Sequence, residues 1–321
     1  MSILTGGYTA ALSPDTTRTA IDKVLFEKYD REEQPDVLSA RNPMFFKQDR
    51  TDSMAFIYDE YSNVGRFDVH QEQEEVKITN IRTGNQTSRS IVKYMKSVPV
   101  SWEAFKTDRH GLRAHIGADI GDRARLSEDR VAILETYGDA FVTTGNTTPD
   151  GAALASNSHT TITGGTVDNL ETGSLTPTNL WTAVVSLTNQ QGQDDELGSH
   201  VFTGLLVPTT LYRVAREVMN STLIANSAEN NLNIFYTTYG TVAIKHSPFL
   251  GSTYNSASNA NTSYHLISQN HFITHMILDE LSTDLIEPRY SRTDSWEYRA
   301  RFAQDNFPGS WTGVVSSNGS V

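Results

Sequence analysis

Two groups of imidazole and carboxylate side chains are the first places where this sequence could do chemistry. His110 and His115 stand five residues apart, whereas a helix needs a spacing of four to turn both toward one metal ion. Glu72, Glu74 and Glu75 form a run of carboxylates, which serve as general acid and base only where burial tunes their pKa values. We therefore expect no metal at the histidines and a solvated acidic face at the glutamates.

His159 is the third candidate, in a loop rich in Gly, Ser and Thr that also carries Asp150. A histidine supported by an aspartate can act as the base of a hydrolase if a nucleophile stands beside it. No Walker, Gly-x-Gly-x-x-Gly, Gly-x-Ser-x-Gly or His-Glu-x-x-His motif is present. We therefore favour a packed or hydrogen-bonded His159, and expect no catalytic, cofactor-binding or metal site and no enzyme activity.

The composition excludes further kinds of site and partner. None of the 321 residues is cysteine, which rules out disulfides, thiolate metal sites and cysteine nucleophiles. The net charge of −12, from 26 Lys and Arg against 38 Asp and Glu, argues against a dedicated nucleic-acid binder. No apolar run approaches the ~20 residues of a membrane span, and the first residues show no signal-peptide pattern. We expect no membrane contact and folding in the cytosol.

The first hundred residues predict an arm and a long hairpin. A helix-like stretch at 21–29 ends before Pro35, because proline cannot continue a helix. Beyond it, β-prone residues at 55–58 and 89–100 flank a turn signal at Gly84-Asn85. This polar hairpin has little to bury, and an isolated two-stranded hairpin is marginal in water. We expect it to lie on another surface, such as a neighbouring subunit.

Residues 101–140 predict a long helix with Ser101 as its N-cap. An apolar stripe recurs every four residues, formed by Leu112, Ile116, Ile120 and Ala124. Glycines weaken a helix, so those in this stretch should mark bends or places where another backbone comes close. They are Gly111, Gly117 and Gly121.

The remainder predicts a loop, a mixed lobe and closing strands. Residues 143–178 are rich in Gly, Thr and Ser and form a long loop or short hairpin. The lobe should contain helices at 180–189, capped near Thr178, and 211–220, capped by Thr209, and strands at 204–208, 241–244 and 265–267. Near the end, aromatic residues alternate with charged ones as in a half-buried strand. The aromatic residues are Trp296, Tyr298 and Phe302.

Three stretches carry a family resemblance. They are the loop 150–159 (DGAALASNSH), the strand–helix step 205–221 that opens with Leu-Leu-Val-Pro, and the aromatic strand around Trp296 and Tyr298. In this order and spacing, the chain resembles the HK97-fold major capsid proteins of tailed bacteriophages, particularly the Mu-like major head subunit group. The resemblance implies an α+β fold with an N-terminal arm, an extended β-hairpin loop, a peripheral domain with a long spine helix, and an axial domain.

The resemblance also implies boundaries and partners. The arm would be 1–47, the extended loop 48–100, the peripheral domain with its spine helix and following loop 101–178, the axial domain 179–281, and the peripheral-domain return strands 282–321. Such a chain self-assembles as pentamers and hexamers into an icosahedral phage head around double-stranded DNA. It would be a virion protein assembled in the host cytoplasm, with weak non-specific DNA contact. A portal and a decoration or cement protein are further expected partners.

Two features of some family members are not expected. The sequence reaches shell-like residues soon after Met1, so we expect a separate scaffold protein or none. Some members join Lys to Asn covalently between subunits, but no matching Asn or catalytic Glu is evident for Lys77 of the hairpin. We expect the shell to be held by non-covalent contacts.

Three alternatives stay open at this point. An encapsulin-type nanocompartment shell has the same fold but packages enzymes and forms small particles without DNA. A hydrolase would use His159 and Asp150, and their replacement would then abolish turnover without affecting assembly. A β-rich tail or adhesin protein would form trimers or fibres with little helix, which conflicts with the helix predicted at 101–140.

Overall fold

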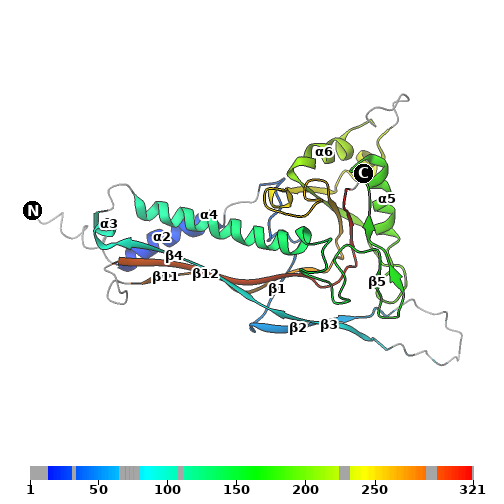
Figure 1. Ribbon diagram of the computed structural model, residues 1–321, viewed down its shortest axis with the longest axis horizontal. Helices are drawn as coiled ribbons and strands as arrows, with labels where there is room; N and C mark the ends of the chain where they lie inside the picture. The colour runs from blue at the N-terminus through cyan, green and yellow to red at the C-terminus, as the bar shows by residue number, and fades with distance from the viewer. Residues whose placement is uncertain are drawn as a thin grey trace, which may run out of the picture.

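The computed structural model describes residues 14–30, 34–64, 80–107, 111–223, 232–286 and 295–319, with a few single positions between 65 and 79. The chain forms an elongated wing and a compact lobe, and a hairpin runs along their lower side in the view of Figure 1. The wing carries the long helix, whereas the lobe contains the C-terminus (Figure 1). No helix in the described ranges combines the length and apolar character needed to cross a bilayer.

The wing is built on a four-stranded sheet in the order β1-β11-β12-β4. The long strands β11 (Ile273–Ile286) and β12 (Ser295–Pro308) pair antiparallel, and β4 (Val92–Ser101) lies antiparallel along β12. The short strand β1 (Lys47–Arg50) runs parallel to β11 at one edge. The predicted aromatic strand is confirmed within β12, where Trp296, Tyr298 and Phe302 are buried.

Two helices cover one face of this sheet. Helix α2 (Pro14–Tyr29) and helix α4 (Leu112–Ile133) lie side by side and bury a shared apolar cluster on β11 and β12 (Figure 1). The cluster includes Ile21, Leu25, Ile120, Ala124, Leu281, Tyr298 and Phe302.

The helix predicted over 101–140 is confirmed only in part. Ser101 Oγ accepts a hydrogen bond from the Ala104 N–H at 3.3 Å, but the helix that it caps is the short α3 (Trp102–Thr107). α4 then begins after Gly111, whose φ of 65° lies in the left-handed region that favours glycine. The last turn widens into a π-helix, η1 (Leu134–Gly138). One predicted helix is thus three consecutive elements.

Gly117 and Gly121 lie where the backbone of α2 comes close, as one of the two predicted roles of these glycines requires. A Cβ atom at Gly117 would stand 2.9 Å from the Ile21 carbonyl oxygen, and one at Gly121 would stand 2.4 Å from that of Leu25. Both spacings are four residues, so two successive helical turns meet without side chains between them. The two glycines therefore set how deeply α2 sits on α4.

We expect Gly121→Ala to destabilise the subunit by ~1–3 kcal/mol, the usual result of overpacking a close contact. At an unstrained helical site the same change stabilises by ~0.4–1 kcal/mol, so the sign separates the two situations. Chemical denaturation of the unassembled subunit measures the difference. Asp119→Ala is the control, since it removes only an exposed ion pair with Arg123 and should leave stability unchanged. A gain in stability for Gly121→Ala would contradict the close contact.

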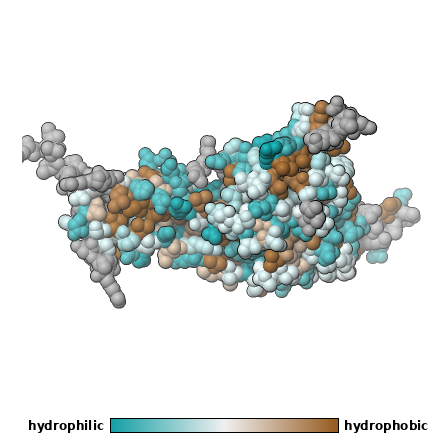
Figure 2. All heavy atoms as spheres, turned by 45° about the horizontal axis from the view of Figure 1, so that its top comes forward, coloured by the Kyte–Doolittle hydropathy of each residue, from teal (hydrophilic) through white to brown (hydrophobic). Residues whose placement is uncertain are grey.

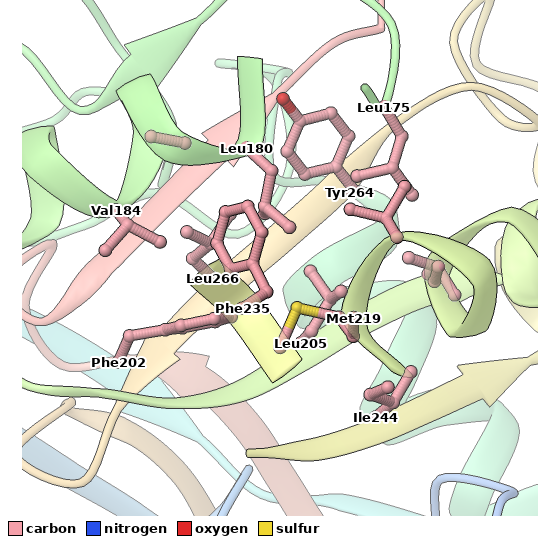
Figure 3. Close-up of a cluster of buried hydrophobic side chains, with 14 of the residues drawn as sticks. Leu175, Leu180, Val184, Phe202, Leu205, Met219, Phe235, Ile244, Tyr264 and Leu266 are labelled. Atoms are coloured by element: carbon pink, nitrogen blue, oxygen red, sulfur yellow. The ribbon is translucent and has the colours of Figure 1, made fainter. Parts of the chain in front are cut away.

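The lobe is built on a five-stranded sheet in the order β7-β13-β10-β8-β9. These strands are Leu170–Glu171 (β7), Val314–Ser317 (β13), Tyr264–Ser268 (β10), Phe202–Pro208 (β8) and Ala243–Ser247 (β9). One face is covered by α5 (Pro177–Thr188), α6 (Tyr212–Asn220) and α7 (Ile234–Thr238), which enclose the cluster drawn in Figure 3. Leu180 and Val184 of α5 point toward Phe202, Leu266 and Phe235 there (Figure 3).

The other face of the lobe sheet joins the wing. Leu206 of β8 and Val314 of β13 share a buried cluster with Tyr137 of η1 and with Phe45 and Phe46. The Tyr137 hydroxyl donates to the Phe45 carbonyl at 2.7 Å. Wing and lobe therefore share one continuous core at this junction.

One predicted cap lies two residues from its expected place, and the other is wrong. α5 is capped by Thr176, whose Oγ1 accepts from the Asn179 N–H at 3.2 Å, because Pro177 occupies the first helical position. Thr209 begins a 3₁₀ turn, η2 (Thr209–Leu211), and its Oγ1 lies 3.2 Å from His246 Nδ1. A second 3₁₀ turn, η3 (Pro248–Leu250), follows β9.

The ends of the predicted segments do not coincide with sheet boundaries. The loop predicted at 143–178 contains a short hairpin, β5 (His159–Thr160) with β6 (Thr166–Val167), before β7 joins the lobe sheet. Strand β11 crosses the boundary expected at 281/282 as one continuous strand. Strand β13 returns to the lobe between β7 and β10, so the last residues are not wing strands.

The predicted hairpin is correct in existence but wrong in its pairing. β2 (Ala55–Tyr61) pairs with β3 (Thr83–Ser90), whereas residues 92–101 form β4 and pair with β12 in the wing. Gly84 lies inside β3 rather than in a turn, because its lack of a side chain makes room for Ile162. The hairpin also packs partly on its own subunit, which the sequence did not predict. Phe56 and Tyr58 contact Phe307, with ring centroids 5.8 and 5.2 Å apart.

Candidate functional site

The structure describes only part of the first two candidate groups, so the absence of a metal and the solvated acidic face stay predictions. His115 is exposed on α4, and His110 lies outside the described residues. Glu72 and Glu75 are exposed. Glu74 and Lys77, like His110, lie outside the described residues. Across the described part of the chain, no three His, Cys, Asp or Glu side chains form a group that could hold a metal ion.

His159 and Asp150 do lie together, deep in the molecule. His159 Nδ1 lies 2.8 Å from Asp150 Oδ2, and His159 Nε2 lies 3.2 Å from the Leu154 carbonyl oxygen. The imidazole also stacks on Trp311, in the turn between β12 and β13, with 5.1 Å between ring centroids. Burial alone would raise the pKa of Asp150, but the hydrogen bonds from His159 and Thr148 outweigh it and lower that pKa.

This geometry fits a structural role, in which the pair holds two segments of the chain together. Both ring nitrogens of His159 face hydrogen-bond acceptors, the Asp150 carboxylate and the Leu154 carbonyl. Its side chain is 0% exposed, and in the described structure both nitrogens are occupied by Asp150 and Leu154 rather than by a hydroxyl nucleophile. The pair ties the loop after η1 to the turn that carries Trp311.

A second ionic group, partly buried, lies beside the last turn of α2 and was not predicted from the sequence. Arg41 Nε and Nη2 donate to the two carboxylate oxygens of Glu128 at 3.2 and 3.3 Å. The Arg41 guanidinium also lies 4.1 Å from the centre of the Tyr29 ring, and His275 Nε2 lies 3.6 Å from Glu128 Oε1. Burial would raise the pKa of Glu128, but His275 and Arg41 together outweigh it and hold that pKa at about 2.

A third ionic group fixes the base of the hairpin. Arg89 of β3 donates from Nε and Nη2 to Asp305 of β12 at 3.0 and 3.2 Å, and both side chains are largely buried. Glu135 lies close by, with Asn306 Nδ2 3.5 Å from its Oε2. Burial, reinforced by the charge of Asp305, raises the pKa of Glu135 to about 7, although Asn306 and Arg89 oppose the shift.

The raised pKa of Glu135 predicts a pH effect with a defined sign. The folded subunit holds the Glu135 proton more tightly than the unfolded chain, whose carboxyl has a pKa near 4.5. The contribution is therefore fully present below pH 4.5 and is lost as pH rises through about 7. Glu135→Gln, which cannot ionise, should gain stability relative to the unaltered protein between pH 5 and pH 8. Denaturation midpoints at both pH values test this, and an equal difference at both would contradict it.

Hydrophobic side chains remain at the surface of both parts of the molecule. In the view of Figure 2 they gather over the wing and over the lobe. On the hairpin, Met54, Ile57 and Tyr61 are 54%, 64% and 58% exposed. None of the three belongs to the cluster in which Phe56 and Tyr58 pack on Phe307. Further examples are Met95 on β4, Trp102 on α3 and Trp181 on α5. The subunit alone leaves a substantial apolar surface in water.

Comparison with known proteins agrees with this architecture. The family described as phage capsid protein matches residues 84–317, most of the chain, whereas no curated protein matches. The capsid of the cyanophage P-SCSP1u has a TM-score of 0.54 at 13% identity, over 89% of this chain and 91% of that one. The capsid of a native GTA particle has a TM-score of 0.55 at 8% identity, over 91% and 95%.

A third structure, a virus-like particle from Pyrococcus furiosus, has a TM-score of 0.53 at 10% identity and covers 95% of this chain and 98% of its own. Identities this low carry the fold and nothing finer. The fold matches an α+β capsid subunit of the HK97 type, with a hairpin, a spine helix and two sheets. With a family match that spans most of its length, the chain belongs to the phage capsid protein family.

Proposed function

We propose that copies of this capsid protein assemble as pentamers and hexamers into a closed icosahedral head that encloses double-stranded DNA. The observation that carries the proposal is the outer side of the hairpin. Ile57 stays 64% exposed there, while its neighbours Phe56 and Tyr58 pack on Phe307 on the inner side and Arg89 pairs with Asp305. A surface of this kind gains stability only when another molecule covers it, and repetition by symmetry closes a shell.

We infer that the wing is the peripheral domain and the lobe the axial domain. The strand pairing favours a revised division, in which 92–101, 273–286 and 295–308 belong to the wing and 314–317 to the lobe. The expected limits at 100/101 and 281/282 therefore move. A separate scaffold, a portal, a decoration protein, weak contact with DNA, assembly in the host cytoplasm and the Mu-like subgroup stay predictions.

Microscopy of the purified chain tests the proposal. We expect closed particles by negative stain, and we expect Ile57→Asp to fold but remain as small oligomers, because it places a charge on the outer side of the hairpin. Ile57→Val keeps the apolar surface and should assemble normally. Boiled particles should run as monomers on SDS gels if the contacts are non-covalent.

Three outcomes would decide against the proposal. Normal particles from Ile57→Asp would show that the outer side of the hairpin takes no part in assembly. Small particles that carry enzymes and lack DNA, when isolated from the native source, would instead favour the nanocompartment. Turnover that depends on His159 while assembly is intact would favour a hydrolase.

A further inference from the structure

A cavity of about 460 Å³ lies where the hairpin meets the lobe. Three segments that are far apart in sequence line it: the end of β2, the loop between α5 and β8, and the turn between β12 and β13. They contribute Glu60, Gln193 and Ser310, in that order. None of these residues takes part in the proposed outer hairpin contact.

The hydrogen bonds in the cavity leave an excess of acceptors. Gln193 Nε2 donates to Glu60 Oε1 at 2.5 Å and to Ser310 Oγ at 3.2 Å, which fixes the orientation of the amide. Its Oε1 and the second carboxylate oxygen of Glu60 then have no hydrogen-bond partner in the described structure. Both side chains are only 5% exposed, so water outside the protein does not compensate them fully.

Other groups on the wall point to positive charge as what is missing. Asp59 Oδ1 is also buried without a partner in the described part of the chain, as is His200 Nδ1. Burial, reinforced by the charge of Asp150, raises the pKa of Glu60 to about 7, although the hydrogen bonds with Ser310 and Gln193 oppose the shift. Lys47 lines the cavity, but its Nζ lies over the Phe272 ring at 4.2 Å.

We propose that this cavity binds a hydrated divalent cation of the magnesium or calcium type, through Glu60 Oε2 and Gln193 Oε1. Such hard ions take carboxylate and amide oxygens, and magnesium in particular is held by one or two carboxylates while keeping several waters. Each water occupies ~30 Å³ in the liquid, so the cavity holds the ion with its inner waters. A hydrated ion also needs no group of three His, Asp or Glu side chains, which the described residues do not provide.

The bound ion links the hairpin to the lobe. Glu60 belongs to β2 and Gln193 to the lobe, so the ion adds a second link beside the hydrogen bond between these two side chains. Cation binding therefore holds the base of the hairpin in the orientation seen here.

Terbium luminescence tests the site in the full chain after treatment with a chelator. Tyr58 lines the cavity, and a tyrosine close to Tb³⁺ transfers its excitation energy to the ion. We expect saturable tyrosine-sensitised emission that calcium or magnesium displaces. Glu60→Gln should weaken terbium binding at least tenfold, because it removes the charge but keeps the hydrogen-bond acceptor for Gln193. Glu103→Gln, at an exposed carboxylate on α3, is the matched control and should bind normally.

A second variant tests whether weaker terbium binding comes from the loss of a ligand atom and not from misfolding. Gln193→Leu removes Oε1 at similar volume, and circular dichroism checks that both variants keep their secondary structure. The expected result is weaker terbium binding in both folded variants. No sensitised emission from the unaltered protein, or equal affinity in Glu60→Gln, overturns the proposal and leaves the cavity filled with water alone.

Discussion

Replacing His159 with alanine should cost the subunit ~3–5 kcal/mol, the range for truncating a large buried ring, because it leaves a cavity and removes a buried hydrogen bond. Asp150 would keep its buried carboxylate, with a side chain only 2% exposed, but lose its contact at 2.8 Å. Trp311 would lose the ring that stacks on it. Denaturant titration of the unassembled subunit, followed by tryptophan fluorescence, measures the effect.

The control for this experiment is His115→Ala. His115 is exposed on α4, so the same substitution there should leave the unfolding free energy unchanged. Subunit concentration must be equal in all samples, because assembly itself shifts apparent stability. If His159→Ala were as stable as the unaltered protein, the structural role of the His159–Asp150 pair would be wrong.

Glu128→Gln should cost about 3 kcal/mol at pH 7, since a pKa held near 2 instead of 4.5 corresponds to a stabilisation of that order. The folded pKa is the lower one, so the stabilisation is present above pH 4.5 and is lost as pH falls through about 2. The stability gap between Glu128→Gln and the unaltered protein should therefore narrow steadily below pH 4.5. Denaturant midpoints from pH 7 to pH 3 measure it.

The matched control is Glu217→Gln on α6. Glu217 also pairs with an arginine, Arg213 at 2.8 Å, but both side chains are largely exposed. Water screens such a pair, so its loss should leave stability unchanged at every pH. A gap for Glu128→Gln that stays constant from pH 7 to pH 3 would show that packing, and not the ionised carboxylate, is what the substitution removes.

The predictions that succeeded rest on local periodicity. The stripe through Ile120 and Ala124 and the alternation through Tyr298 and Phe302 are visible within ten residues of sequence, and both face the wing core. The packed role of His159 followed from the lack of a nucleophile motif, and its partner Asp150 stands nearby in the same loop. Periods of this kind report which side of an element is buried.

The failures concern which elements meet. Alternation at 89–100 indicated a strand but held no information on its partner, which is β12, about two hundred residues later. Arg41 and Glu128 are separated by 87 positions, and Arg89 and Asp305 by 216. Single charged residues of this kind look like ordinary surface residues until the fold brings them together. The core that η1 shares with the lobe sheet could not be predicted from the sequence for the same reason.

The two 14-residue strands of the wing have a mechanical consequence. At ~3.3 Å per residue each spans roughly 45 Å. Tension applied along that direction is carried by covalent backbone and by a ladder of hydrogen bonds loaded in shear. The hairpin is anchored at its base mainly by side chains such as Arg89 and Phe56. Under outward pressure, the wing should stay stiff while the hairpins yield first.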